Sequence, residues 1–359
     1  MMRCSRLGRA LALALLAGAL AAAAGAGEFK RNETRSFSVT PLASLEIRNP
    51  SGLVEVIGED REDLHLDVLY RVRGRDAERA MALMELLGVS MAADEERADR
   101  VLVVPTLEER PLFSRDATPP RGYSVRVDLK LRVPRDVAVE AAVTSGRLEA
   151  RDLAGGAVLG ATSGEVQAER LSGTLIFNLT SGDLDLKDLR GPLEIAITSG
   201  ALRLEDHEGD ALITCFGGDM DLRDIAGDLT VSSISGSITV NDVTGRLRAN
   251  TTSGDISIRR AEGSVWLRTS SGSLEVFDAG REGQSLDLAS SSGDIHVTLR
   301  ETASLRVDVT TAIGAIRCRL PLEIETITRK RLIGVLGGGK EDARIETASG
   351  DIRILGTED

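Results

Sequence analysis

The sequence predicts an all-β protein: a single-stranded parallel β-helix (β-solenoid) with 18-residue coils, preceded by an irregular β-rich region that carries one short helix. The first observation is a corner glycine, usually preceded by serine, that returns every 18 residues, at Gly146, Gly164, Gly182, Gly200, Gly218, Gly236, Gly254 and Gly272. A second glycine register lies nine residues further on, from Gly155 to Gly263. A fixed period of this kind is the signature of a repeat architecture.

The second observation is the alternation of apolar and polar residues inside each repeat. In the unit that begins at Gly182, apolar residues fall at Leu184, Leu186, Leu189, Leu193, Ile195 and Ile197. The repeat length of 18 also equals five turns of α-helix, so the length alone does not decide the secondary structure. The period-two alternation and the β-branched residues decide for strands.

The third observation is that apolar residues form columns down the array. Two residues after the corner glycine come Leu148, Val166, Leu184, Leu202, Met220, Ile238, Ile256 and Leu274. If each repeat is one coil, these side chains stack at the strand spacing of about 4.8 Å, and they form a core that no single repeat could bury alone. The structural rival is an antiparallel meander with hairpins at the glycines, which would leave one apolar face in need of a second layer.

Two polar columns follow the same period. Asp152, Asp188, Asp206, Asp224 and Asp242 each precede a repeat glycine by three residues, as Asp and Gly do in a type I turn. The alternative role for this column is to bind calcium, but the sequence lacks the calcium-binding nonapeptide pattern Gly-Gly-x-Gly-x-Asp. Thr144, Thr162, Thr180, Thr198 and Thr252 form a second column, whose hydroxyls we expect to satisfy one another and the corner backbone. We therefore expect neither a metal nor a cofactor.

The first 26 residues are typical of a secretory signal peptide. Arg3, Arg6 and Arg9 precede an alanine-rich apolar run, and 24–26 form a small-residue cleavage site. We expect no transmembrane segment after signal removal, because no other stretch is long and apolar enough. The predicted location is therefore the periplasm, the cell surface or the extracellular space. The parts of the chain are a signal peptide (1–26), an N-terminal β-rich region with one helix at 76–88 (27–136), the β-helix repeat domain (137–355) and an acidic tail (356–359).

The N-terminal region contains two recognisable signals. Leu45–Val56 is a divergent copy of the repeat. The helix signal has Asp76 as its N-cap and Gly88 as its C-cap.

Charge and cysteine content narrow the range of partners. The net charge of −12 becomes −15 once the three arginines of the signal peptide are removed, which argues against nucleic acid and anionic membrane surfaces as partners. Cys215 and Cys318 would lie more than five coils apart, on the order of 25 Å. A disulfide needs Cα atoms within about 7 Å, so both cysteines should be free.

A search for catalytic groups yields no constellation. His65, His207 and His296 have no ligand spacing between them, and His207 shares an apolar column with Leu189 and is interpreted as a buried structural histidine. The acidic pairs recur in consecutive repeats and are therefore repeat features rather than a general acid and base. We expect a protein that is not an enzyme.

Two places are candidates for partner binding. Trp266 and Phe277 occupy outward columns, and the alternative interpretation for both is ordinary exposed apolar surface. Arg329, Lys330 and Arg331 form a basic run in an insertion from Pro321 to Asp342, and insertions of a solenoid become loops on one face, often the binding face. The alternative for the run is a solvated loop.

The motif Thr-Ser-Gly-Asp-Ile/Leu-x-Ile/Leu recurs at Thr180–Leu186 and Thr252–Ile258, with close variants at Ser291–Val297 and Ala348–Ile354. With the signal peptide, this resembles the putative adhesin family, bacterial domains of unknown function with Ser-Gly-Asp β-strand repeats. The resemblance covers residues 36–355. It implies an exported right-handed β-helix of the cell envelope, and it supplies no catalytic residues to carry over.

The leading function hypothesis is an exported, non-enzymatic β-solenoid that serves as an adhesin-like scaffold or interaction module of the cell envelope. Its partner would be an unknown protein or glycan. The alternative is an envelope regulatory or self-assembling structural protein, in which the solenoids associate end to end through uncapped ends. A polysaccharide-active enzyme on a β-helix is the least favoured hypothesis, because no acid/base cluster is visible.

Overall fold

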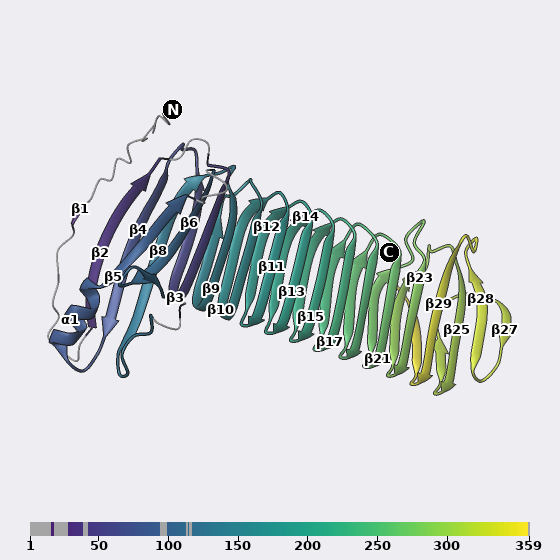
Figure 1. The fold of residues 1–359 in the computed structure, drawn as a ribbon. Helices are drawn as coiled ribbons and strands as arrows, with labels where there is room; N and C mark the ends of the chain where they lie inside the picture. Colours follow the sequence, from purple (N-terminus) through teal and green to yellow (C-terminus); the bar gives the residue numbers. More distant parts are fainter. Residues whose placement is uncertain are drawn as a thin grey trace, which may run out of the picture. The chain divides into compact units, whose positions relative to one another are not determined.

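A computed structural model describes residues 16–17, 28–38, 42–93, 99–112, 114 and 117–357 of the chain (Figure 1). The chain forms two compact units, Met1–Gly156 and Ala157–Asp359. The predicted all-β class with one short helix is confirmed. The predicted signal peptide lies outside the described residues, except for Leu16 and Ala17.

The first unit is built around one pair of long parallel strands. Its elements are β1 (Leu16–Ala17), β2 (Glu28–Phe37), β3 (Ser44–Glu59), β4 (Leu64–Arg73), α1 (Ala77–Glu85), β5 (Leu87–Ala93), β6 (Arg100–Leu107), β7 (Arg110–Pro111), β8 (Ser124–Pro134) and β9 (Ala138–Arg151). β3 pairs with β9 so that Gly52 lies opposite Gly146, which confirms the divergent repeat copy in this segment. β3 also pairs in parallel with β6 and β8. Three antiparallel pairs extend the sheet: β4 with β8, β2 with β4, and β5 with β6.

The helix is shorter than the sequence predicts. The carboxylate of Asp76 accepts a hydrogen bond from the backbone N–H of Arg79, as expected of an N-cap. The C-cap is Leu86, however, and the assignment of Gly88 to this position is wrong. Gly88 already lies opposite Thr106 in the β5–β6 pair, because strand pairing begins as soon as the helix ends.

The second unit is the stack of coils. Its strands are β10 (Ala157–Ser172), β11 (Leu175–Ser181), β12 (Leu184–Arg190), β13 (Leu193–Ser199), β14 (Leu202–Glu208), β15 (Ala211–Gly217), β16 (Met220–Ala226), β17 (Leu229–Ser235), β18 (Ile238–Val243), β19 (Leu247–Ser253), β20 (Ile256–Ala261), β21 (Val265–Ser271), β22 (Leu274–Ala279), β23 (Leu286–Ser292), β24 (Ile295–Arg300), β25 (Leu305–Ile313), β26 (Ile316–Cys318), β27 (Glu323–Ile327), β28 (Arg331–Leu336), β29 (Glu341–Ser349) and β30 (Ile352–Thr357).

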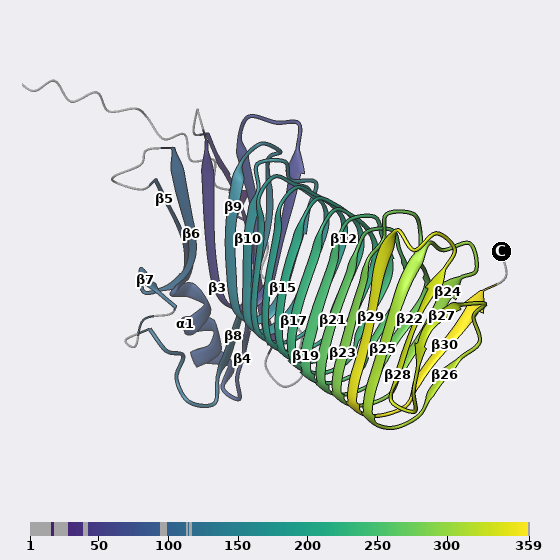
Figure 2. The same ribbon diagram turned by 90° about the vertical axis from the view of Figure 1, so that its right-hand side faces the viewer.

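The coils form two parallel strand stacks (Figure 2). The first stack runs through the odd-numbered strands β11 to β23, and the second through the even-numbered strands β12 to β24. Each residue of the regular coils lies opposite the residue 18 positions on, as Leu184 lies opposite Leu202. The apolar columns point inward and are buried. The parallel coil is therefore confirmed and the antiparallel meander is excluded for the regular repeats.

The last coils do not stack in sequence order. β29 and β30 pair with β23 and β24, and β25 and β26 pair with the opposite side of β29 and β30. The final coil of the sequence is thus inserted between two earlier ones. Beyond it, β28 pairs antiparallel with β25, and β27 with β28. The prediction that 321–342 forms a loop on one face is wrong: the segment is a hairpin that covers the edge of β25.

The corner glycines hold the coils at their spacing. At Gly218, with φ of +136°, an added Cβ would lie 1.9 Å from the carbonyl oxygen of Gly200 in the preceding coil. The N–H of Gly218 donates to the carbonyl of Ser235 in the next coil at 3.2 Å. Only glycine combines this backbone conformation with this close approach.

The aspartate column has a different role from the predicted turn. Asp188 and its column mates have φ between +52° and +60°, and Arg170 and Arg260 occupy the same left-handed conformation at the same repeat position. These residues make a bend inside the strand, with two consecutive exposed positions before the next buried one. Their assignment to the first position of a type I turn is therefore wrong, although Asp suits the site because it tolerates this conformation.

A second set of aspartates, each directly after a corner glycine, links the coils. The carboxylate of Asp219 accepts a hydrogen bond from the N–H of Ser237 at 2.9 Å, and that of Asp255 accepts one from Ser273 at 2.7 Å. Each bond joins equivalent positions of successive coils. The Asp after the corner glycine is thus a backbone hydrogen-bond acceptor that returns at every second coil, at Asp183, Asp219 and Asp255.

His207 lies inside the core, between Leu189 and Ile225 of its column. It is buried, and neither ring nitrogen has a hydrogen-bond partner among the described residues. Burial lowers the pKa of His207 below its usual value, an effect that nearby backbone groups offset only in part. Cys215, also in the core, and Cys318 are both free, as predicted.

We predict that Gly218→Ala lowers the free energy of unfolding by at least about 2 kcal/mol, because the methyl group meets a carbonyl oxygen and the residue keeps a positive φ. The matched control is Gly217→Ala, whose added Cβ would lie no closer than 3.4 Å to Ser235 Oγ. Urea denaturation of both variants measures the difference. Equal denaturation midpoints would contradict the role of the corner.

We also predict that His207 makes the folded protein less stable as the pH falls. The unfolded histidine titrates near pH 6.5 and the folded one below it, so the stabilisation is present above about pH 6.5 and is lost as the pH falls through the lowered pKa. His207→Leu should therefore flatten the decline of the urea midpoint between pH 7.5 and 5. The prediction fails if this variant keeps the wild-type slope.

Candidate functional site

The basic run forms the tip of the hairpin between β27 and β28. The Thr328 N–H donates to the carbonyl of Arg331 at 2.8 Å, and Thr328 Oγ1 accepts from the N–H groups of Lys330 and Arg331. Arg329 and Lys330 are thus the two central residues of a tight hairpin turn. The sequence predicts that these residues lie in an insertion, but it does not show that the insertion lies at the end of the stack.

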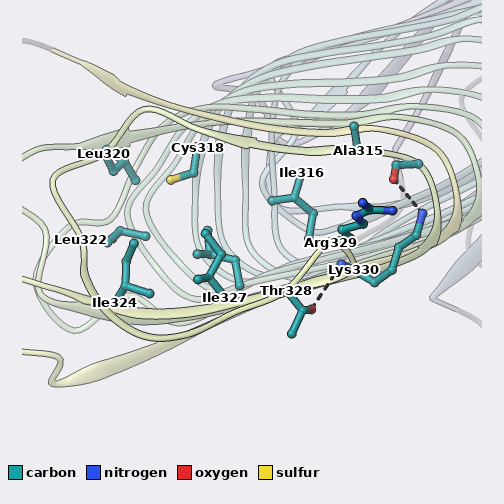
Figure 3. A pocket seen from close by; sticks show the side chains of 12 residues that line it. Ala315, Ile316, Cys318, Leu320, Leu322, Ile324, Ile327, Thr328, Arg329 and Lys330 are labelled. Carbon is teal, nitrogen blue, oxygen red and sulfur yellow. Dashed lines mark hydrogen bonds between the residues drawn. The ribbon is translucent and has the colours of Figure 1, made fainter.

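Beside this turn lies a cavity of about 610 Å³, which we call the terminal pocket (Figure 3). It lies between β26 on one side and the β27–β28 hairpin on the other. Its lining residues are Gly314, Ala315, Ile316, Cys318, Leu320, Leu322, Ile324, Ile327, Thr328, Arg329, Lys330 and Leu332. The pocket combines a mostly apolar lining with two cations, within the size range of about 300–1,000 Å³ that is usual for ligand pockets.

The terminal pocket exists because the last coil lacks a neighbour in one stack. Ile316 and Cys318 lie opposite Ile352 and Ile354, which are completely buried. On their other side no described strand follows, so Ile316 and Cys318 remain half-buried. Burial also raises the pKa of the Cys318 thiol, so this group is neutral at physiological pH.

The three basic residues have different surroundings. Arg331 makes two hydrogen bonds to the carboxylate of Asp308, at 3.0 and 2.8 Å, and these hold the pKa of Asp308 below its usual range. Lys330 Nζ donates to the carbonyl oxygen of Gly314 at 2.9 Å. Arg329 makes no ion pair or side-chain hydrogen bond within the described part of the chain. Arg329 and Lys330 therefore line the pocket, and Arg331 does not.

The two aromatic candidates lie in different strand stacks. Trp266 of β21 packs between Arg248 and Arg268, whose guanidinium carbons lie 4.0 and 4.7 Å from the ring centroid. The guanidinium carbon of Arg259 lies 5.3 Å from the ring centroid of Phe277 of β22. The ring of His296 is edge-on to that of Phe277, with 6.0 Å between the two centroids. The structure thus does not join Trp266 and Phe277 into one patch of the same stack. Each forms its own cation–π cluster.

A second hollow, of about 590 Å³, runs over the outward face of β12, β14 and β16. Its carboxylates include Asp183 and Asp219, which accept backbone hydrogen bonds from the following coil. These groups are used by the fold itself. No cluster of three or more His, Cys, Asp or Glu suited to a metal ion occurs within the described ranges.

The basic run predicted the cations of the terminal pocket, but its apolar lining was not predicted. The signal was present: Leu320, Leu322 and Ile324 alternate at the start of the insertion, yet they match no column of the repeat. Such residues have no coil to bury them. Three of the exposed large apolar residues of this unit, Ile313, Ile324 and Ile327, gather in these last strands.

We predict that Arg248→Gln exposes Trp266, the only tryptophan of the chain. Removal of the guanidinium that lies 4.0 Å from the ring should raise the acrylamide quenching constant of its fluorescence by about half, since an exposed cation–π contact is worth about 0.5–1 kcal/mol. Arg203→Gln, in the other stack, is the control and should leave quenching unchanged. Identical quenching of the two variants would show that Arg248 does not cover the ring.

Comparison with known proteins gives a family and three similar structures. No curated protein matches the sequence. A putative cell adhesion protein from Clostridium sporogenes is 10% identical, with 91% of this chain and 100% of the other covered and a TM-score of 0.22. Putative adhesins from Bacteroides fragilis (10% identity; 90% and 97% covered; TM-score 0.28) and Parabacteroides distasonis (9%; 90% and 97%; 0.28) are also similar. These scores are low, and the function of this chain does not follow from the three proteins.

No helix within the described residues is long and apolar enough to cross a membrane. The Toastrack DUF4097 model, which represents a domain of unknown function, matches residues 126–355. The match covers well over half of the chain and confirms the predicted resemblance, so this protein belongs to the Toastrack DUF4097 family.

Proposed function

We propose that this protein is an exported, non-enzymatic, adhesin-like interaction module of the cell envelope, and that it binds its partner at the terminal pocket. The signal peptide predicted for residues 1–26 supports export. The observation that carries the proposal is the pocket itself: a cavity with mostly apolar lining side chains and a basic edge, held at the end of a hydrogen-bonded stack.

The stack suits the display of a binding site better than a catalytic role. Several of its outward carboxylates accept backbone hydrogen bonds or pair with arginines: an oxygen of Asp228 lies 2.6 Å from a guanidinium nitrogen of Arg246, and Asp228 also accepts from the backbone N–H of Arg246. Arg246 lowers the pKa of Asp228, which keeps this carboxylate ionised at physiological pH. Such groups serve the ladder of coils. A rigid ladder holds the terminal pocket in one geometry, which reduces the entropy lost on binding.

End-to-end association of solenoids is the second candidate function. Ile313, Ile324 and Ile327 are 70%, 55% and 68% exposed, and exposed apolar side chains of this size are a usual mark of an interaction surface. Sedimentation of the purified chain over a range of concentrations distinguishes the two functions: a monomer that binds envelope material supports the first, and concentration-dependent polymers support the second.

We predict saturable binding of the full chain to isolated cell envelopes of its source organism. Ile327→Asp, at the pocket, should weaken this binding at least tenfold, because it places a carboxylate at the apolar lining. Ile234→Asp is the matched control, since Ile234 is similarly exposed but lies in the middle of the stack.

Export is tested by fractionation, in which Leu13→Arg should retain the chain in the cytoplasm. Equal binding of both isoleucine variants, or cytoplasmic wild-type protein, would contradict the proposal.

A further inference from the structure

The terminal pocket exposes apolar surface that the rest of the stack buries. Ile324 and Ile327 remain more than half exposed, and every residue of β27 is exposed. In the preceding coils, side chains at inward positions, such as Ile352 and Ile354, are completely buried. Within the described part of the second unit, the inner apolar column therefore opens to solvent where β26 has no further neighbour. An apolar ligand that enters here would take the place of the missing coil.

The charges of the pocket specify the head group of such a ligand. The only charged lining residues are Arg329 and Lys330, and no carboxylate lines the pocket. This contrasts with the net charge of −12 of the chain and with outward arginines such as Arg246 and Arg260, which pair with Asp228 and Asp242. Arg331, the next residue of the same turn, is bound to Asp308. The two lining cations are therefore uncompensated within the pocket and complementary to an anion.

The two properties lie at opposite ends of the cavity. Figure 3 shows Leu320, Leu322 and Ile324 at one end, and Arg329 and Lys330 at the other, with Ile316 between them. This arrangement matches an elongated molecule with an apolar tail and one anionic head. It does not match a flat polar ligand such as a sugar, which would need hydrogen-bonding groups along its whole length.

We propose that the terminal pocket binds a single-chain anionic amphiphile, a free monoacyl carboxylate, with its tail against Leu320, Leu322 and Ile324 and its carboxylate at Arg329 and Lys330. This inference rests on the proposed function, because it names the ligand class of the same site. A second copy of the chain fits less well, since a symmetric contact would bring Arg329 of both copies together without a counter-charge.

The test is isothermal titration of the full chain with octanoate, decanoate and laurate, each below its micelle concentration. Every buried methylene strengthens binding about fourfold, so two methylenes should lower Kd about fifteenfold. Arg329→Gln should weaken laurate binding about tenfold, and Arg331→Gln should leave it within twofold. Dodecyltrimethylammonium, with the same tail and the opposite charge, should bind at least tenfold more weakly than laurate. Chain-length independence, or equal binding of the cationic amphiphile, would overturn the proposal.

The alkylation of Cys318 gives a second measurement of ligand binding, independent of calorimetry. It lines the pocket and is half-buried, so laurate should slow its alkylation by a maleimide, as followed by mass spectrometry of the peptide that contains it. The peptide of the buried Cys215 is the internal control and should stay unmodified. Protection that is lost in Arg329→Gln supports the site. Protection by vesicles of anionic diacyl lipid but not by laurate, or by increased protein concentration alone, would overturn it in favour of a membrane or a second copy.

The outcomes separate this inference from the proposed function. If laurate binds at the pocket but envelopes do not bind the chain, the amphiphile site stands and the envelope role is wrong. If envelopes bind in an Ile327-dependent manner while no monoacyl anion does, the role stands and the ligand class is wrong.

Discussion

The structure depends on the close approach of backbone at the glycine corners. From Gly182 to Gly254, the carbonyl oxygen of one corner lies 1.7–2.1 Å from the place where the Cβ of the next corner residue would be. Any side chain there would separate the coils and break the hydrogen bonds between laps. Because the corners can touch, the strands keep β-sheet spacing, and equal residues of successive coils meet. The buried columns, the aspartate links and the bend residues all follow from that register.

A stack of equal layers has a problem at its end, because each coil relies on the next one to cover its interior. In the second unit, only one of the two strand stacks is covered at its end among the described residues. The β27–β28 hairpin covers the edge of β25, whereas nothing follows β26 among the described residues. The uncovered residues Ile316 and Cys318 become the wall of the terminal pocket. The site is therefore a consequence of how the solenoid ends, and the turn at Arg329 adds charge to it.

Much of the regular stack was predictable, and the reason is physical. The period of 18, the alternation around Leu184 and the column of His207 are local or strictly periodic, so each repeat confirms the others. The predictions failed where a single residue had to choose among conformations. Asp188 suits both a turn and a left-handed bend, and the choice depends on which neighbours must face inward. Gly88 fits a C-cap, but pairing with β6 takes it into a strand.

The sequence by itself determined which residues face the core and where the backbone of successive coils must touch, because these properties repeat with the chain. Only the tertiary structure decided the order of the last coils. The pairing of Ile295 with Ile352 spans 57 residues, and the sequence offers Gly314 as an equally good next corner. A different contact, the antiparallel pairing of β25 with β28, brings the turn at Arg329 to the pocket that Ile316 lines. Such contacts depend on which strand edges remain unpaired after the rest of the stack has formed, and no local pattern records that.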